Sequence, residues 1–392
     1  MRPLIVLDAA PFCYGPVSTL MAIVDHIPPD AADLVLLASG TVAEFAVPYG
    51  DRFRVVECDT EKLEDLERIA PLLEQCDLFV SNTNPPAALF ACRRGCPTIY
   101  VDTLFWMWDE VDREIAESVL IYAAQDFDGI GENRRRIGSH IRNFRVVGPL
   151  ISTPPPAPGH RENRCIVSFG GMESSLTIPG TTNRYPWVMT KLLLKALDRV
   201  EPFDNILFCG RGPVMEQLAG EFGRPDAEFR FVAHNELIAE LQRCRMLLLS
   251  PGLTGCFEAA AAGTPTVLLL PQNYSQQLQA ATFAADRGWP FEGNDWSRIY
   301  PSVNFPRYMP EAEAIAGLNQ VIRNFEADAD AQERYVNMVV EDMHAATGRR
   351  SGHTMRSGAA DVAEMIMQVL AAGPLRSRTH RAAAGAAAME PI

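Results

Sequence analysis

The sequence predicts an α/β protein made of two doubly wound domains, each a parallel β-sheet covered by helices. Two observations carry this prediction. Short runs rich in Val, Ile and Leu recur along the chain and are nearly continuous in hydrophobicity, which is typical of strands buried on both faces of a parallel sheet. Helical patterns fit between most of these runs, so the chain reads as two βαβ series separated by a proline-rich segment.

The first series covers residues 1–150 and predicts seven strands in one domain. Helices are expected between most of them, for example over Glu61–Glu74 and Pro85–Arg93. The expected strands are Leu4–Asp8, Asp33–Ala38, Phe53–Cys58, Asp77–Ser81, Pro97–Asp102, Val119–Ala123 and Phe144–Val147.

A linker is predicted between the two series. Residues 153–159 contain four prolines and a glycine, which stiffen the backbone and prevent a helix. An ordinary surface loop is the alternative, but a new βαβ series starts directly after this segment. The second domain is therefore expected over residues 160–345.

The second series predicts five strands: Cys165–Phe169, Asn205–Cys209, Glu228–Val232, Met246–Ser250 and Thr266–Pro271. Its helices are expected at Trp187–Arg199, Val214–Phe222, Glu236–Cys244, Gly255–Ala262, Ser275–Asp286, Glu311–Phe325 and Asp330–His344. Within residues 355–372 a last helix is expected to return to the N-terminal domain. Residues 373–392, rich in Arg and Ala, are expected to be a disordered tail.

The composition excludes several classes of protein. The 392 residues carry 35 Lys and Arg against 49 Asp and Glu, a formal net charge of −14, which argues against a nucleic-acid binder. No apolar run reaches the ~18 residues of a transmembrane helix, and Met1–Asp8 reads as a strand rather than a signal peptide. We expect a cytoplasmic monomer or homodimer without stable membrane insertion.

The nine cysteines do not form a metal-binding pattern. They are scattered, and several lie in strand-like apolar runs, as reduced cysteines do in the cytosol. Cys92 and Cys96 are the only close pair, and no second Cys or His pair stands at zinc-site spacing. Neither a metal nor a cofactor is therefore expected.

The segment that most strongly indicates chemistry begins at Ser250. A strand is expected to end there, a turn containing Gly252 follows, and a helix begins near Thr254 or Gly255, whose N-terminal N–H groups favour an anion such as a diphosphate. Glu258 is expected on the first turn, within reach of a ribose hydroxyl pair. A pair of glutamines follows the next strand. Singly, these residues read as a helix-dipole charge and surface polar groups, but their order favours a binding site.

In this order the segment resembles the donor-binding signature of the GT-B glycosyltransferases, and most closely that of the peptidoglycan N-acetylglucosaminyltransferase. The signature has a Ser-Gly turn, a helix with an embedded Glu, a Gly-x-Pro step and a Gln-Gln pair. The spacing from Glu258 to Gly263 matches it. The resemblance implies two Rossmann-like domains facing a cleft, with the donor held by the C-terminal domain and the acceptor by the N-terminal one.

The resemblance also implies a role for each residue of the segment. Glu258 would hold the nucleotide ribose. The N-terminus of the helix would bind the diphosphate through Gly252, Leu253, Thr254 and Gly255. The donor sugar would be held by Gln276 and Gln277.

Three upstream segments agree with the signature in position. Gly170 and Gly171 resemble the glycine loop after the first strand of the donor domain, and Arg211 follows the next strand, where it is expected to neutralise the leaving diphosphate. A solvated loop charge is the alternative for Arg211. His234 lies where backbone groups of the family read the base. The resemblance covers about residues 144–285 well, and the N-terminal domain in architecture only.

The first loop departs from the family pattern, which is rich in glycine and often carries a His. Here it contains Tyr14 and Gly15, both expected to contact the acceptor, but no histidine. The candidate bases are therefore two carboxylates at strand ends, Asp102 and Asp8, each of which has helix or turn capping as its alternative. Trp106 follows Asp102 and is expected to stack on an acceptor, with core packing as its alternative.

The sequence therefore predicts an enzyme that transfers a sugar from a UDP-type nucleotide sugar to a small acceptor without a metal. Biosynthesis of a natural product or a nucleoside antibiotic is one setting, and a cytosylglucuronate-synthase-like enzyme is one candidate. A nucleotide-sugar hydrolase or epimerase of the same fold is the first alternative, and a non-catalytic nucleotide-sugar-binding protein is the second.

Overall fold

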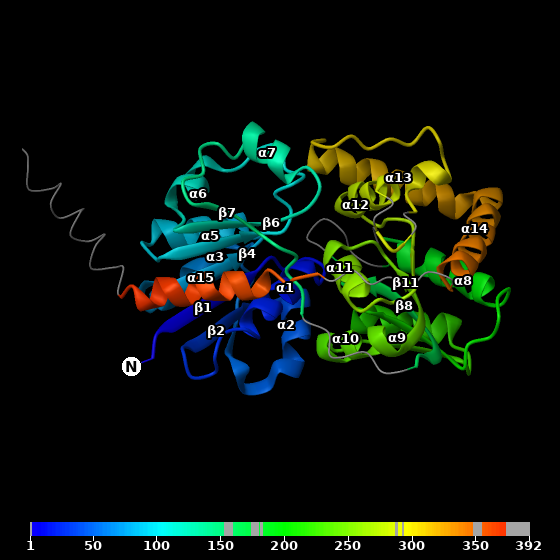
Figure 1. Cartoon of the computed structure of the whole chain (residues 1–392), viewed down its shortest axis with the longest axis horizontal. Helices are drawn as coiled ribbons and strands as arrows, with labels where there is room; N and C mark the ends of the chain where they lie inside the picture. The colour runs from blue at the N-terminus through cyan, green and yellow to red at the C-terminus, as the bar shows by residue number, and fades with distance from the viewer. Residues whose placement is uncertain are drawn as a thin grey trace, which may run out of the picture. The chain divides into compact units, whose positions relative to one another are not determined.

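The computed structural model describes residues 2–152, 160–173, 180, 183–286, 289–291, 294–347 and 355–373 (Figure 1). The chain divides into two compact units. The first contains Met1–Pro11, Pro16–Ile151 and Arg356–Ile392, and the second contains Phe12–Gly15 and Ser152–Met355. The predicted linker residues 153–159 lie outside the described residues, as does the predicted tail from residue 374 onward.

The first unit is built on a parallel sheet of seven strands in the order β3-β2-β1-β4-β5-β6-β7. Because successive crossovers run one way from β1 to β3 and the other way from β4 to β7, the order reverses between β1 and β4. Ligands of doubly wound sheets bind outside the carboxyl ends of the strands at such a reversal. The strands are β1 (Leu4–Ala9), β2 (Asp33–Ala38), β3 (Arg54–Glu57), β4 (Leu78–Asn82), β5 (Thr98–Asp102), β6 (Ile121–Gln125) and β7 (Phe144–Val147).

The helices of the first unit connect these strands. They are α1 (Gly15–Val24), α2 (Gly40–Ala46), the 3₁₀ helix η1 (Val47–Arg52), α3 (Leu63–Arg68), α4 (Ala70–Gln75), α5 (Pro85–Arg93), α6 (Arg113–Ser118) and α7 (Ile130–Arg136). The single helix expected over Glu61–Glu74 is two helices, because Ile69 leaves the helical conformation and Pro71 lies in the first turn of α4, where it cannot donate to a preceding carbonyl. Pro85–Arg93 is helical as predicted.

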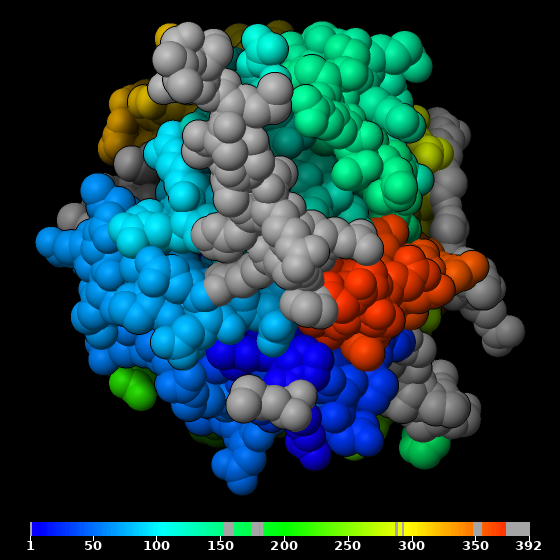
Figure 2. All heavy atoms as spheres, turned by 90° about the vertical axis from the view of Figure 1, so that its left-hand side faces the viewer, coloured from blue at the N-terminus to red at the C-terminus, as the bar shows by residue number. Residues whose placement is uncertain are grey.

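The last helix, α15 (Ala359–Ala371), belongs to the first unit although it is far along the chain. It packs against β7, and Figure 2 shows it in red beside the teal atoms of the segment around β7. Its entry is fixed where the Gly358 N–H donates to the Pro149 carbonyl at 2.8 Å. A side chain on Gly358 would place its Cβ 2.4 Å from the carbonyl oxygen of Gly148, so only glycine fits this crossing.

The second unit has a parallel sheet of five strands in the order β10-β9-β8-β11-β12, which reverses between β8 and β11. Its strands are β8 (Glu162–Gly170), β9 (Asn205–Gly210), β10 (Ala227–Arg230), β11 (Cys244–Leu249) and β12 (Thr266–Leu268). Its helices are α8 (Tyr185–Leu197), α9 (Gly212–Phe222), α10 (His234–Arg243), α11 (Leu253–Ala261), α12 (Tyr274–Ala285), η2 (Trp296–Arg298), α13 (Glu311–Ala327) and α14 (Ala329–Thr347).

The predicted elements of the second unit are present, with shifted ends. β12 is shorter than the expected Thr266–Pro271, and α11 begins at Leu253, before the expected Thr254 or Gly255. The helix starts early because Gly252 is extended (φ −73°, ψ 135°) and serves as the N-cap. None of the helices among the described residues is long and apolar enough to cross a bilayer.

Replacement of Arg161 by Met should lower the melting temperature of the second unit. The guanidinium donates five hydrogen bonds of 2.7–3.1 Å to carbonyls at the ends of α10 and α11, those of Leu241, Gln242, Cys244, Ala262 and Gly263. The last carbonyls of a helix have no intrahelical donor, so the variant leaves several of them unpaired, at a cost of about 2–4 kcal/mol. Thermal unfolding measures this effect; Arg323→Met, on the exposed side of α13, is the control, and equal melting of the two variants would contradict it.

Candidate functional site

The strand order of the second unit directs attention to the loops after β8 and β11. These strands are neighbours, with Ser168 opposite Leu249, so both loops leave the same edge of the sheet at the point of reversal. The first loop contains Gly170, whose φ of +69° favours glycine. It also contains Gly171, where a Cβ would lie 2.4 Å from the backbone carbon of Cys13, a residue of the same unit.

The second loop leads into α11 through the Gly252 N-cap. The first intrahelical hydrogen bond runs from the Cys256 N–H to the Gly252 carbonyl at 2.9 Å, so the N–H groups of Leu253, Thr254 and Gly255 precede the helical ladder. Gly252 brings no side chain that could cap them. With the partial positive charge of the helix end, these N–H groups form an arrangement suited to an anionic group.

Glu258 faces a histidine that lies 24 residues earlier. It lies on the second turn of α11, a correction to the first turn expected from the sequence that follows from the earlier helix start. Its Oε1 is 2.8 Å from Nε2 of His234, the first residue of α10, and each side chain is only 4 % exposed. Within the described part of the chain, Glu258 Oε2 accepts no hydrogen bond.

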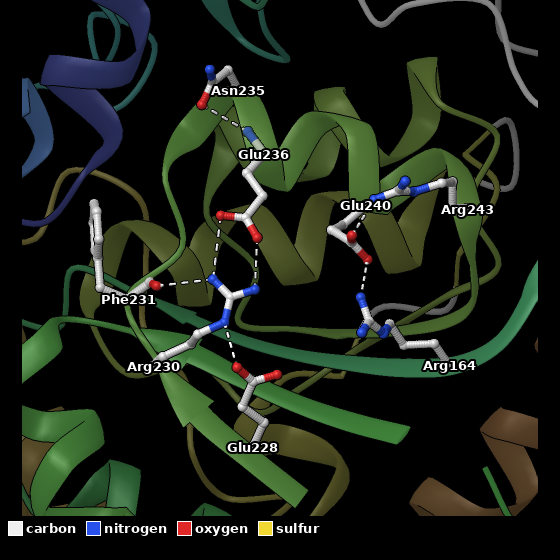
Figure 3. Close-up of polar contacts among 8 residues, drawn as sticks. All are labelled: Arg164, Glu228, Arg230, Phe231, Asn235, Glu236, Glu240 and Arg243. Carbon is white, nitrogen blue, oxygen red and sulfur yellow. Dashed lines mark hydrogen bonds and ion pairs between the residues drawn. The ribbon is translucent and has the colours of Figure 1, made fainter. Parts of the chain in front are cut away.

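The helix that carries His234 is tied to the sheet by ion pairs (Figure 3). On β10, Arg230 Nη2 lies 2.6 Å from Glu236 Oε1, and on β8, Arg164 Nη1 lies 2.6 Å from Glu240 Oε2. The Glu240 side chain is only 5 % exposed, so its pair with Arg164 is better shielded from solvent than the Arg230 pair. These contacts fix α10, and with it the imidazole, relative to the sheet.

The glutamines after β12 are buried and held through their oxygens. Gln276 Oε1 accepts from the Gln272 N–H at 3.1 Å, and Gln277 Oε1 accepts from the Trp296 N–H at 3.2 Å. Gln276 also lies close to the N-cap of α11, because a Cβ on Gly252 would be 3.9 Å from its Nε2. The side-chain amide of Gln276 therefore faces the same loop as the α11 N–H groups.

Gln272 is a buried glutamine that sequence reasoning did not single out. Its Nε2 donates to the Phe169 carbonyl at the end of β8 at 2.7 Å, which fixes the amide plane. Its Oε1 is buried without a hydrogen-bond partner among the described residues. A buried carbonyl oxygen without a donor is destabilising, so this atom favours a ligand or water that brings an N–H or O–H group.

Arg211 and Tyr14 have other contacts in the second unit. Arg211 forms an ion pair with Glu173, and its side chain is 25 % exposed. The ring of Tyr14 meets that of Phe231 edge to face, with centroids 6.1 Å apart. Gly15, expected beside Tyr14 as an acceptor contact, begins α1. None of these contacts tests a role for the three residues in ligand binding.

Asp8 lies at the reversal point of the first unit and is fully buried. Its Oδ2 accepts from Ser81 Oγ at 2.7 Å and its Oδ1 from Asn84 Nδ2 at 3.1 Å, both on the segment that ends β4. Burial raises the pKa of Asp8 to about 6, and the hydrogen bonds from Ser81, Thr60 and Asn84 oppose that rise. The raised pKa brings the change of charge of this carboxyl closer to neutral pH than in an exposed aspartate.

Asp102, the last residue of β5, is also fully buried but has a fuller set of donors. Its carboxylate accepts from Tyr122 Oη at 2.5 Å, from the Leu104 N–H at 2.8 Å and from Trp108 Nε1 at 3.1 and 3.2 Å. Burial raises the pKa of Asp102 above its usual value, and these hydrogen bonds oppose that rise without cancelling it. The arrangement holds the loop after β5 in place.

Trp106 belongs to the core of the first unit. Its exposed fraction is 0 %, and its ring packs edge to face on Phe127 with centroids 4.8 Å apart. The structure therefore favours core packing for Trp106 over the expected stacking on an acceptor. The sequence could not distinguish the two, because an aromatic run at a strand end fits both.

No cluster of three or more His, Cys, Asp or Glu side chains suited to a metal ion occurs among the described residues. Among these residues, the polar groups described at the reversal point of the second sheet are the backbone N–H groups that begin α11, the side-chain amides of Gln272 and Gln276, and the carboxylate of Glu258.

Comparisons with known proteins bear on the fold. No family model and no curated protein matches the sequence. Among solved structures, MurG of Acinetobacter baumannii is 13 % identical over 94 % of this chain and 100 % of that chain, with a TM-score of 0.50. Arabidopsis thaliana UGT89C1 complexed with UDP-L-rhamnose is 12 % identical over 94 % and 99 % of the two chains, with a TM-score of 0.51.

A third similar structure has another activity in its name. A putative UDP-N-acetylglucosamine 2-epimerase from Listeria monocytogenes is 8 % identical over 92 % of this chain and 94 % of that chain, with a TM-score of 0.52. Identities this low establish architecture rather than activity. The chain therefore has the α/β fold of the GT-B glycosyltransferase structures, with two parallel sheets flanked by helices, as the sequence predicted.

Proposed function

We propose that the protein is a glycosyltransferase that moves a sugar from a UDP-type nucleotide sugar to a small acceptor. The second unit would bind the donor, and the first unit would bind the acceptor. The acceptor heteroatom would attack the anomeric carbon, the bond from that carbon to the diphosphate would break, and a carboxylate would take the acceptor proton.

One observation supports the proposal: the edge of the second sheet offers N–H donors for an anion, together with two acceptor oxygens that have no donor among the described residues. The N–H groups at the start of α11 suit a diphosphate. Glu258 Oε2 and Gln272 Oε1 have no hydrogen-bond donor among the described residues, and each belongs to a residue at most 5 % exposed. A ligand that satisfies both kinds of group carries an anion and several hydroxyls, as a nucleotide sugar does.

The resemblance of this segment to the GT-B donor signature supports the choice of a UDP-type donor, as does the UDP-L-rhamnose named with one similar structure. In the reaction, the α11 N–H groups and Arg211 would stabilise the charge that develops on the leaving diphosphate. The acceptor would be a small molecule of natural-product or nucleoside antibiotic biosynthesis.

Isothermal titration with UDP, GDP, CDP and TDP tests donor binding, and turnover of UDP-sugars with and without candidate acceptors tests transfer. We expect UDP to bind most tightly and to raise the melting temperature, because a ligand of the native state stabilises it. Failure of all four diphosphates to bind would reject the proposal.

A second candidate, a nucleotide-sugar hydrolase or epimerase, is favoured by the fold match to the Listeria protein. Release of UDP in the absence of any acceptor, or appearance of an epimeric sugar, would decide for it. Binding without turnover of any kind would favour a non-catalytic binding protein.

A further inference from the structure

The pair formed by His234 and Glu258 leaves one oxygen of a buried carboxylate for a ligand. Nε2 of His234 contacts Oε1 at 2.8 Å, and Oε2 has no partner among the described residues. A glutamate side chain has three rotatable bonds, so without a fixed contact its oxygens would sample several positions. The imidazole removes that freedom at one oxygen and thereby directs the other.

The histidine is itself held in a fixed place. It is the first residue of α10, and α10 is tied to β10 through Arg230 and Glu236 and to β8 through Arg164 and Glu240 (Figure 3). The His234 side chain is 4 % exposed, so neighbouring atoms leave it little room to turn. The contact therefore joins two rigid elements rather than two mobile side chains.

We infer that His234 is a positioning residue that fixes Glu258 so that Oε2 accepts a hydrogen bond from the ribose diol of the nucleotide. The inference rests on the proposed function, since it requires a ribose at this edge of the sheet. It gives the protein a means to distinguish ribonucleotides from deoxyribonucleotides. A site built to bind a hydroxyl discriminates against the analogue that lacks it, because its buried acceptor is then left unpaired.

The test measures dissociation constants of UDP, 2′-deoxy-UDP and 3′-deoxy-UDP for the full-length chain. Wild-type protein should bind UDP at least about 10-fold more tightly than one of the two analogues. In His234→Ala this preference should fall to about twofold, because UDP affinity drops while affinity for that analogue changes little. His234→Gln should retain the preference, because its amide nitrogen can occupy the place of Nε2, whereas the shorter His234→Asn should lose it.

The kinetic readout separates positioning from general damage. With saturating acceptor and varied donor, His234→Ala should raise KM for the nucleotide sugar about 10-fold and leave kcat within about twofold of wild type. His344→Ala, which removes an exposed histidine of α14 in the same unit, is the control and should leave all values unchanged.

The outcomes distinguish this inference from the proposed function. If wild-type protein binds none of the diphosphates, the proposed function fails and the inference fails with it. If UDP binds but His234→Ala or His234→Asn keeps the full preference for ribose, the inference alone is overturned. If His234→Ala does not fold, the decision depends on the difference in ribose preference between His234→Gln and His234→Asn.

A separate observation concerns two cysteines in the first unit. Cys76, directly after α4, and Cys96, which precedes β5, have their sulfur atoms 2.8 Å apart. They stand just before the neighbouring strands β4 and β5, in which Phe79 pairs with Thr98. Sulfur atoms at this separation are within about 1 Å of the ~2.05 Å of a disulfide bond.

We also infer that Cys76 and Cys96 are a site of oxidative modification at which a disulfide forms. The two thiols lose two protons and two electrons, and a disulfide oxidant such as oxidised glutathione is reduced to two thiols. Both side chains are buried, at 0 % and 4 % exposure, so the reaction requires a local opening. The bond would close a loop of about 20 residues and raise the melting temperature by roughly 10 °C.

Refolding in a glutathione redox buffer, followed by alkylation and mass spectrometry, tests the site. We expect a loss of two hydrogens mapped to peptides containing Cys76 and Cys96, in wild type and in the control Cys58→Ser, from the same core cluster. Cys76→Ser and Cys96→Ser should abolish it. A bond mapped to another pair, or no bond at any ratio of oxidised to reduced glutathione, would overturn the inference.

Discussion

Replacement of Glu258 by Ala should weaken the binding of UDP by about 10- to 150-fold while the protein stays folded. The carboxylate is the only charged group on α11, and its Oε2 is placed by His234 for a hydroxyl donor. A hydrogen bond to a charged group contributes about 1.5–3 kcal/mol, which converts to this range of affinity. Titration calorimetry with UDP measures the change.

Two comparisons make the Glu258 result interpretable. Glu216→Ala removes an exposed carboxylate from α9 of the same unit and should leave UDP affinity unchanged. Glu258→Gln keeps the size of the side chain and should lose less affinity than the Ala variant, because its amide oxygen still accepts a hydrogen bond. UDP affinity equal to that of wild type in both Glu258 variants would show that the segment after β11 has been misassigned.

The architecture could be predicted from the sequence because buried parallel strands leave a strong local signal. Runs such as Leu4–Asp8 and Asn205–Cys209 are apolar almost throughout, and the structure contains a strand at each. Strand and helix ends were less predictable, since they depend on single residues. The extended Gly252 starts α11 early, and Ile69 with Pro71 divides the helix expected over Glu61–Glu74.

The details of the candidate site depend on contacts that sequence order does not reveal. Glu258 and His234 are 24 residues apart, and only the fold of the second unit brings the imidazole at the start of α10 to the carboxylate on α11. The sequence did not indicate a separate role for Gln272. Its Oε1 is left without a donor because Nε2 of the same amide is held by the carbonyl of Phe169, 103 residues earlier. In the same way, nothing near Asp102 in sequence indicated that Tyr122 would donate to it.

The two candidate bases should respond differently to replacement by Asn. We expect Asp8→Asn to lower kcat by about 100-fold or more with little change in UDP affinity, since general base catalysis contributes factors of this size. A pKa raised to about 6 by burial makes Asp8 suited to accept a proton near neutral pH. Asp102, the other candidate base, already accepts hydrogen bonds from Tyr122, Trp108 and Leu104.

Protein stability gives an independent readout for Asp8. Because its folded pKa lies above the value of 3.8 expected when unfolded, the folded state holds the proton more tightly, and stability falls as pH rises from about 4 to about 6. Asp8→Asn removes this loss and should be more stable than wild type above pH 6, by up to ~3 kcal/mol, with no such gain below pH 4. Denaturant unfolding at pH 4 and pH 8 measures the difference.

The combination of the two readouts assigns the base. If Asp8→Asn is more stable than wild type at pH 8 and its kcat is about 100-fold lower, Asp8 is the base. Its carboxylate is then retained for activity at a cost in stability. If Asp8→Asn keeps full turnover and Asp102→Asn loses about 100-fold with unchanged UDP affinity, the base is Asp102, and its hydrogen bonds must rearrange when the acceptor binds. Full turnover in both variants would mean that the acceptor is a good enough nucleophile to react without a base, as an amine or an ionised hydroxyl is.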